Sequence, residues 1–191
     1  MDESLGRLVL PLSALMRWFR ETGIRGVVVG GVAVSLRGKP RLTKDVDVVV
    51  LDVDAEALLK SAHAFDLVPR IDDAIEFARH TRVLLLRHSP THIDIDVSLG
   101  ALPFEEEIVE RSELLDAGAV RVRVASAEDL VIMKAVAGRP RDIADIGTLI
   151  DATPDLDITR IRRWIREFSS VLEMPEIHEN LEKLLAKGHR G

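Results

Sequence analysis

Two aspartates separated by a single valine are the residues whose types and spacing most directly indicate chemistry. Asp45, Val46 and Asp47 follow a glycine pair, Gly30 and Gly31, after thirteen intervening residues. Side chains repeat their direction every second residue along a strand, so both carboxylates would project from one face, about 6.5–7 Å apart. Such a pair repels itself unless water or a cation intervenes, and Mg²⁺ prefers oxygen ligands together with substrate phosphates. The pair predicts half of a phosphate-bridged metal site.

The glycine pair predicts the other half of that site. Without side chains there, the backbone can approach a ligand closely, and the free N–H groups at the start of the next helix point toward an anion. Taken alone, two glycines are more typical of a tight strand-to-helix turn, and they lack the G-x-G-x-x-G spacing of a dinucleotide site. The basic residues between the glycines and the acids would neutralise a polyphosphate; they are Arg37, Lys39, Arg41 and Lys44.

A third carboxylate would complete a two-metal site or act as a general base. Asp94 and Asp96 also stand at strand spacing, and both are candidates. Either would help deprotonate an attacking hydroxyl while the metals stabilise an in-line displacement. The competing interpretation of all these acids is a set of solvated carboxylates on an edge strand.

The composition is that of a folded globular protein. Of 191 residues, 47% are hydrophobic and 30% charged, and none is cysteine, which excludes a mostly disordered chain, a disulfide scaffold and a thiolate zinc site. The net charge is −6, yet residues 1–44 carry eight Lys or Arg against three Asp or Glu. The sequence shows neither a signal peptide nor an apolar run long enough to span a membrane, so we expect a cytoplasmic protein without a membrane partner.

Apolar periodicity predicts the elements that position these residues. We expect an α+β fold, with a mixed β-sheet and flanking helices in a catalytic core over 1–125, and a helical C-terminal subdomain over 126–191. A run of arginines late in the chain, Arg160, Arg162, Arg163 and Arg166, predicts either an RNA-binding patch or a solvated helix face. The expected helices cover 8–22, 32–36, a segment capped by Asp54, and 104–111, with later starts at Ser126, Pro140, Thr159 and Pro175; the expected strands cover 27–29, 45–51, 81–86, 92–99 and 120–124.

The combination of motifs resembles the DNA polymerase beta-like nucleotidyltransferase superfamily. Its signature is similar to Gly30-Gly31 followed by the acid-apolar-acid run Asp45-Val-Asp47. Later stretches resemble the bacterial abortive-infection type nucleotidyltransferases that act as toxins in toxin–antitoxin pairs. These stretches are Ile93-Asp-Ile-Asp96-Val-Ser-Leu-Gly100, Pro103-Phe-Glu105, and Ser126 through Asp145.

The resemblance implies roles for individual residues. It selects Asp96 over Asp94 as the third carboxylate, because the family's acid stands four residues before the equivalent of Gly100. It makes Lys134 a catalytic residue near the triphosphate, with Asp142 or Asp145 orienting it. Asp45, Asp47 and Asp96 would then bind Mg²⁺, with Mn²⁺ as a substitute, and the nucleotide-binding residues would be Gly30, Gly31, Ser35, Arg41 and Thr43.

The implied activity is a Mg²⁺-dependent nucleotidyltransferase that moves a nucleoside monophosphate from an NTP to a hydroxyl acceptor. The acceptor would be RNA, such as tRNA, or a protein, and a toxin of this kind would have a cognate antitoxin. Two alternatives stay open. One is a non-catalytic nucleotide-binding or partner-binding module on the same fold; the other is a phosphodiesterase or nuclease with water as the attacking group.

Overall fold

The computed structural model describes the backbone of residues 6–188 and the side chains of residues 6–186. It separates into two compact units. The first comprises the described residues up to Leu36 together with Pro40–Ala125, and the second comprises Arg37–Lys39 together with the chain from Ser126 onward.

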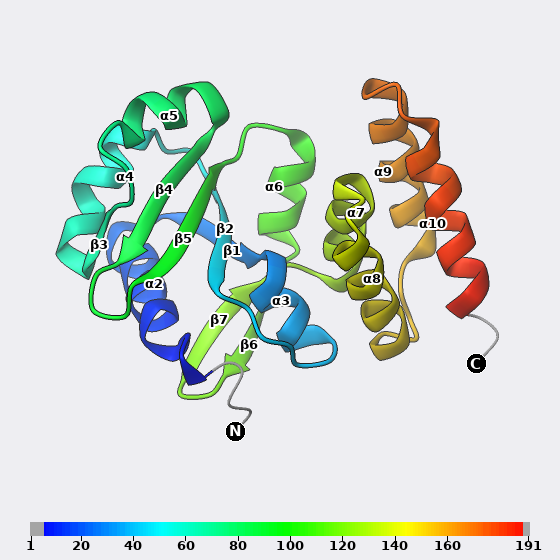
Figure 1. Cartoon of the computed structure of the whole chain (residues 1–191), viewed down its shortest axis with the longest axis horizontal. Coiled ribbons are helices and arrows are strands. Elements are labelled where there is room, and N and C mark those ends of the chain that lie inside the picture. Colours follow the sequence, from blue (N-terminus) through cyan, green and yellow to red (C-terminus); the bar gives the residue numbers. More distant parts are fainter. Residues whose placement is uncertain (1–5, 189–191) are drawn as a thin grey trace. The chain divides into compact units, whose positions relative to one another are not determined.

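The first unit is built on a mixed sheet of seven strands in the order β3-β4-β5-β2-β1-β7-β6 (Figure 1). β2 pairs with β5, and β1 with β7, in parallel, whereas the other neighbours are antiparallel. The strands are β1 (Arg25–Val29), β2 (Asp45–Leu51), β3 (Leu67–Pro69), β4 (Val83–His88), β5 (Ile93–Leu99), β6 (Glu113–Ala117) and β7 (Val120–Val124).

Helices pack against this sheet through apolar side chains. Trp18 is fully buried, and its indole N–H donates to the Ser61 hydroxyl at 2.9 Å. The ring of Phe19 lies against Gly26 of β1, where a Cβ atom would stand 2.4 Å from the ring. The helices of this unit are α2 (Val9–Thr22), α3 (Gly30–Arg37), α4 (Ala55–Ala62), the 3₁₀ turn η1 (His63–Phe65), α5 (Ala74–Thr81) and α6 (Pro103–Glu110).

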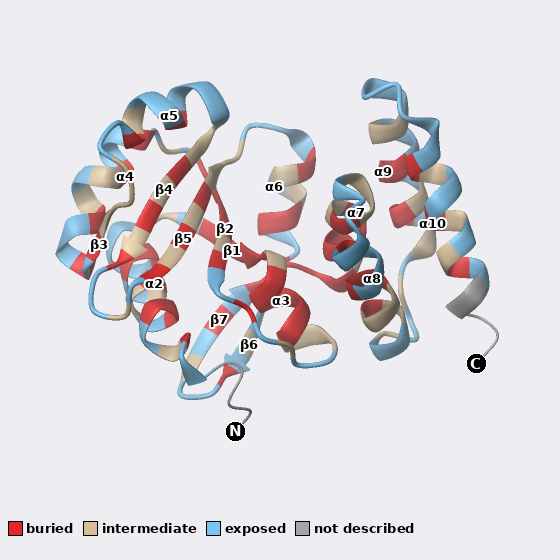
Figure 2. Cartoon of the chain, in the orientation of Figure 1, coloured by how far each residue is buried: buried red, intermediate tan, exposed pale blue. Residues whose placement is uncertain are grey.

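The alternation in β2 decides which residues become core and which become available for chemistry. Val46 and Val48 are fully buried on one face, whereas Asp45 is exposed and Asp47 half-buried on the other. Buried residues run along β1 and the second half of β2 (Figure 2). The apolar side chains therefore anchor the strand, and positions 45 and 47 stay available for polar side chains.

The expected strand at 81–86 is wrong in its bounds, and three elements were not expected. Thr81 ends α5, and Arg82 adopts a left-handed conformation before β4 begins. The buried positions of α5 are the alanines Ala74 and Ala78, which give little apolar periodicity. β3 has only three residues, and β6 is mostly exposed at the sheet edge, so neither carries a strong strand pattern.

The described residues of the second unit form four helices, and their caps follow the expected chemistry. The Ser126 hydroxyl accepts a hydrogen bond from the backbone N–H of Asp129, as predicted for the start of α7. The next-to-last helix begins at Ile158 with Asp157 as its cap, one residue before the expected Thr159. The helices are α7 (Ala127–Ala137), α8 (Pro140–Ala152), α9 (Ile158–Val171) and α10 (Pro175–Gly188).

The expected patch of four arginines on α9 is wrong for one member. Arg160 is buried, and its Nη1 lies 2.7 Å from Oδ1 of the buried Asp129. Arg162 forms a bidentate ion pair with Glu182 of α10, with both hydrogen bonds at 2.8 Å. These two arginines therefore join helices within the unit. Among residues 6–188, no helix is long and apolar enough to cross a membrane.

Candidate functional site

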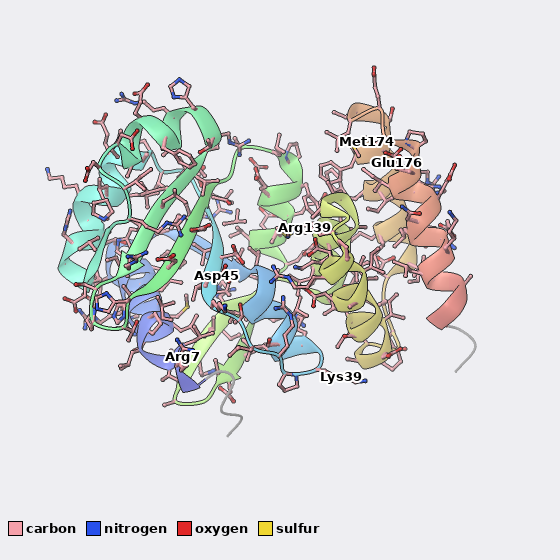
Figure 3. All side chains as sticks on the ribbon, viewed as in Figure 1. Arg7, Lys39, Asp45, Arg139, Met174 and Glu176 are labelled. Atoms are coloured by element: carbon pink, nitrogen blue, oxygen red, sulfur yellow. The ribbon has the colours of Figure 1, made fainter. Side chains whose placement is uncertain are left out.

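Four carboxylates share one face of the sheet because β2 and β5 are parallel and in register. Asp45 pairs with Asp94, and Asp47 with Asp96. Paired residues on neighbouring strands point to the same face, and so do residues two apart on one strand. All four acids therefore project from one face where both strands begin. Figure 3 shows Asp45 at the start of β2.

The carboxylate of Asp47 lies against Gly30, where β1 turns directly into α3. Gly30 has a φ of +61°, a left-handed conformation that glycine adopts without strain. A Cβ atom at this position would stand 1.9 Å from Oδ2 of Asp47. The missing side chain thus lets one acid reach the first turn of a helix, where backbone N–H groups attract anions.

The loop before β2 covers Gly31. A Cβ atom at Gly31 would stand 2.6 Å from Oγ1 of Thr43 and 3.1 Å from Nη2 of Arg41. Thr43 also donates its hydroxyl to Oδ1 of Asp45 at 3.2 Å. The structure therefore gathers the predicted nucleotide-binding residues Gly31, Arg41 and Thr43 beside Asp45.

The buried hydroxyl of Ser35 contacts backbone carbonyl groups of α3 and of the loop before β2. It is 3.0 Å from the carbonyl oxygen of Gly31 and 3.2 Å from that of Arg41. These contacts fix the loop against the first turns of α3. Binding of Ser35 to a nucleotide stays a prediction.

Two arginines that we did not predict lie beside the acids of β5. Arg70 places Nη1 3.2 Å from Oδ2 of Asp94 and 3.0 Å from Oδ1 of Asp96. Arg87 donates from Nε to Oδ1 of Asp94 at 2.7 Å. The face therefore carries two positive groups next to its four negative ones.

These neighbours shift the two carboxyl groups in opposite directions. Burial acts to raise the pKa of Asp94, but the hydrogen bond from Arg87 and the charge of Arg70 outweigh it, so the pKa lies below its ordinary value. For Asp96, burial is the largest effect and raises the pKa above its ordinary value; the charges of Asp45 and Asp94 add to it, and Arg70 opposes it. Asp94 is therefore held as a carboxylate, while Asp96 carries the less stabilised charge.

The carboxylates fit a hard divalent cation in donor type. Asp45, Asp47 and Asp96 supply oxygen ligands where the central strands β2 and β5 begin, and Gly30 leaves room for the carboxylate of Asp47. Within the described part of the chain, however, no three His, Asp or Glu side chains already stand close enough together to hold a metal ion. Because Asp96 is turned toward Arg70 at 3.0 Å, a shared cation requires adjustment of side chains on a fixed backbone.

The predicted catalytic Lys134 lies in the second unit, inside a buried ion cluster. Its Nζ is 2.8 Å from Oδ1 of Asp142 and 3.1 Å from Oδ2 of Asp145, and its side chain is only 6% exposed. Arg139 also contacts Asp142, from Nε to Oδ2 at 2.6 Å. This cluster joins α7 to α8. Contact of Lys134 with a triphosphate stays a prediction of the resemblance.

Sequence reasoning missed Arg70 and Arg87 for different reasons. Arg87 and Asp94 face each other across the β4–β5 hairpin, so counting back from the Ser89-Pro90 turn could have found that pair. Arg70 follows the three-residue strand β3, and its backbone N–H donates to the carbonyl of Leu85 at 3.0 Å. Its position depends on a distant pairing with no local signal.

Comparisons with known proteins agree with this fold. A family model described as "Nucleotidyltransferase of unknown function (DUF6036)" matches residues 13–185. The crystal structure of an antigenic nucleotidyltransferase-like protein from Paracoccidioides brasiliensis matches with 19% identity and a TM-score of 0.55, over 95% of this chain and 93% of that one. The solution structure of the antibiotic-resistance factor ANT(2'')-Ia matches with 13% identity and a TM-score of 0.58, over 89% and 96% of the two chains. A search of curated proteins found no match.

These likenesses confirm the predicted α+β fold of the nucleotidyltransferase type, with its mixed sheet and flanking helices.

The first prediction concerns the space that Gly30 leaves for Asp47. Gly30→Ala should destabilise the protein by about 1–2 kcal/mol through the left-handed backbone, and by about 1–3 kcal/mol more because the new Cβ displaces Asp47. Gly23→Ala is a matched control, since Gly23 also has a left-handed φ, +74°, but nothing lies within 4 Å of an added Cβ. Urea unfolding of both variants measures the difference.

Part of the excess loss should disappear when Gly30→Ala is combined with Asp47→Ala, because the carboxylate then no longer opposes the new methyl group, whereas the Cβ atom of residue 47 still lies 2.9 Å from it. Equal losses for Gly30→Ala and Gly23→Ala would contradict the contact.

The second prediction concerns the ion cluster around Lys134. Burial acts to raise the pKa of Asp142, but hydrogen bonds from Arg139 and Lys134 hold it below the ordinary 3.8. A lowered folded-state pKa stabilises the fold above pH 3.8, and this stabilisation is lost as the pH falls through the folded-state value. Asp142→Asn should therefore cost about 3 kcal/mol at pH 7 and progressively less below about pH 3.8.

Urea unfolding at pH 7 and pH 3 checks this dependence. Asp151→Asn, on the exposed side of the same helix, is the control and should change stability little at either pH. A loss for Asp142→Asn that is the same at both pH values would show that the carboxylate charge is not what stabilises the cluster.

Proposed function

This chain belongs to the family of nucleotidyltransferases of unknown function (DUF6036), and on that premise we propose that it transfers a nucleoside monophosphate from a nucleoside triphosphate to a hydroxyl acceptor. The observation that carries the proposal is the contact of Asp47 with Gly30 at the first turn of α3. It sets an acid of β2 beside a helix N-terminus, so that ligands for a cation and for a phosphate are neighbours.

The phosphates of the nucleotide would lie over the first turn of α3. Gly30 and Gly31 leave that turn open to close approach, and its N–H groups favour anions. Arg41 adds a positive charge beside Gly31. Thr43 offers a hydroxyl between the glycine turn and Asp45.

Asp45, Asp47 and Asp96 would hold Mg²⁺, with Mn²⁺ as a substitute. A bound metal of this kind neutralises charge on the phosphates and favours in-line displacement. The acceptor oxygen forms a bond to the α-phosphorus, the bond between the α-phosphorus and the bridging oxygen breaks, and pyrophosphate leaves. Asp96 takes the proton from the acceptor hydroxyl in this scheme.

The acceptor that we propose is a macromolecular hydroxyl, on RNA such as tRNA or on a protein. This follows from the resemblance of residues 93–100 and 126–145 to abortive-infection toxins. In that case the protein would act as the toxin of a toxin–antitoxin pair and would bind a cognate antitoxin.

The third prediction tests the transfer itself. Asp45→Asn and Asp47→Asn should each lower transfer by about 10³-fold or more, because an amide cannot replace a charged ligand, while unfolding stability stays near that of the wild type. Asp116→Asn is the control, since Asp116 is an exposed acid of β6 with a single 3.6 Å ion pair to Arg121. Each α-³²P-labelled NTP is incubated with Mg²⁺ and total cellular RNA or protein, and the label is followed.

Label attached to RNA or protein, with release of pyrophosphate, supports transfer. Shortened RNA without attached label would instead indicate hydrolysis. NTP binding without turnover against any acceptor pool would favour the non-catalytic module, and full activity of Asp45→Asn or Asp47→Asn would refute the assignment of these acids.

A further inference from the structure

Asp94 and Asp96 stand two residues apart on the same face of β5, but their surroundings differ. Asp94 contacts two guanidinium groups, Arg87 at 2.7 Å and Arg70 at 3.2 Å, one on each carboxylate oxygen. Asp96 contacts Arg70 through Oδ1 alone, at 3.0 Å. Asp94 therefore has a cation on each oxygen, whereas Asp96 has one on a single oxygen and is the acid of β5 better able to bind a metal.

The two oxygens of Asp96 also differ in access to solvent. Oδ1 is buried, yet a third of the side chain is exposed, so the accessible part is the half that carries Oδ2. A carboxylate that is held through one oxygen by an ion pair can offer the other oxygen to a metal ion. Outer partners of this kind orient metal-binding carboxylates in many proteins.

The backbone fixes the origin of Arg70 relative to this acid. The N–H of Arg70 donates to the carbonyl of Leu85, and Leu85 is the register partner of Asp96. Arg70 thus extends the β3–β4 pairing by one residue and starts two strands away from Asp96. The side chain of Arg70 crosses β4, so that its guanidinium group reaches Asp94 and Asp96. The ion pair with Asp94 holds this guanidinium group in place.

We propose that Arg70 is a positioning residue for Asp96, held in place by the ion-pair series Arg87–Asp94–Arg70. The series holds Oδ1 of Asp96 and leaves Oδ2 as the oxygen that would reach the metal site with Asp45 and Asp47, once the side chains of these two acids adjust. The inference rests on the proposed function, since it assigns the geometry of that site. It also gives a physical reason why Asp96, and not Asp94, is the third carboxylate.

The test is the binding of Mn²⁺, measured by electron paramagnetic resonance with the full chain, alone and with ATP. Arg70→Met keeps an unbranched apolar stem and removes the guanidinium group, and it should weaken Mn²⁺ binding about 10–100-fold. Arg70→Lys should recover much of that loss because it restores a positive donor. Asp94→Asn should act in the same direction as Arg70→Met, because Arg70 loses its anchor.

Arg79→Met is the matched control. Arg79 is also paired with a carboxylate, that of Glu56, but the pair joins α5 and α4 away from the acid face, so Mn²⁺ binding should not change. A purely structural role of Arg70 would lower the unfolding temperature and leave the metal affinity of the folded protein as it was. If Arg70→Met does not fold, Arg70→Lys and Asp94→Asn carry the test.

Mn²⁺ affinities of Arg70→Met and Asp94→Asn within twofold of the wild type would overturn the inference, and so would tighter binding, which would show that Arg70 competes with the metal. Transfer of label by the wild type, measured separately, distinguishes the two proposals. Active wild type with unchanged metal affinity in the variants refutes the positioning role alone. Metal binding that depends on Arg70, without transfer to any acceptor, refutes the proposed function alone.

Discussion

The parallel pairing of β2 with β5 is the constraint on which the rest of the site depends. Its register sets Asp45 beside Asp94 and Asp47 beside Asp96, so four negative charges share one small area of the sheet. Two like charges about 4 Å apart repel by about 1 kcal/mol even in bulk water. The register is fixed on the opposite face by buried valines of β2 and buried isoleucines of β5, because a slip of one residue would bury the acids.

Arginines from neighbouring strands offset part of this repulsion, but the carboxylates at the start of β2 and β5 keep their charge. Arg70 and Arg87 lie beside the acids of β5, whereas in β2 Asp45 accepts a hydrogen bond from Thr43 and Asp47 lies against the first turn of α3. The face therefore combines acids on β5 that are paired with arginines and an acid on β2 that lies beside a helix N-terminus. An arrangement of this kind suits a ligand that brings a cation and an anion together, as a metal–nucleotide complex does.

Local patterns in the sequence were sufficient for much of this fold. The alternation of Asp and Val predicted β2 with its bounds, and Gly30-Gly31 predicted the turn from strand to helix. Long-range pairing was not predictable: Arg70 reaches Asp96 only through the pairing of the short strand β3 with β4.

The same limit applies to Lys134 and Arg160. Both are charged residues on helices, and the sequence could not show that Asp142 and Asp129 would neutralise them in the interior of the second unit. Burial of a charge depends on which partner the packing of helices brings to it.

The tight space at Gly31 has a consequence for sequence variation in this family. The volume that a serine side chain would need at position 31 is already filled by the γ-oxygen of Thr43. In this chain the hydroxyl beside the second glycine comes from the following loop. Serine at position 31 and threonine at position 43 should consequently exclude each other, and the two positions should covary when relatives are aligned.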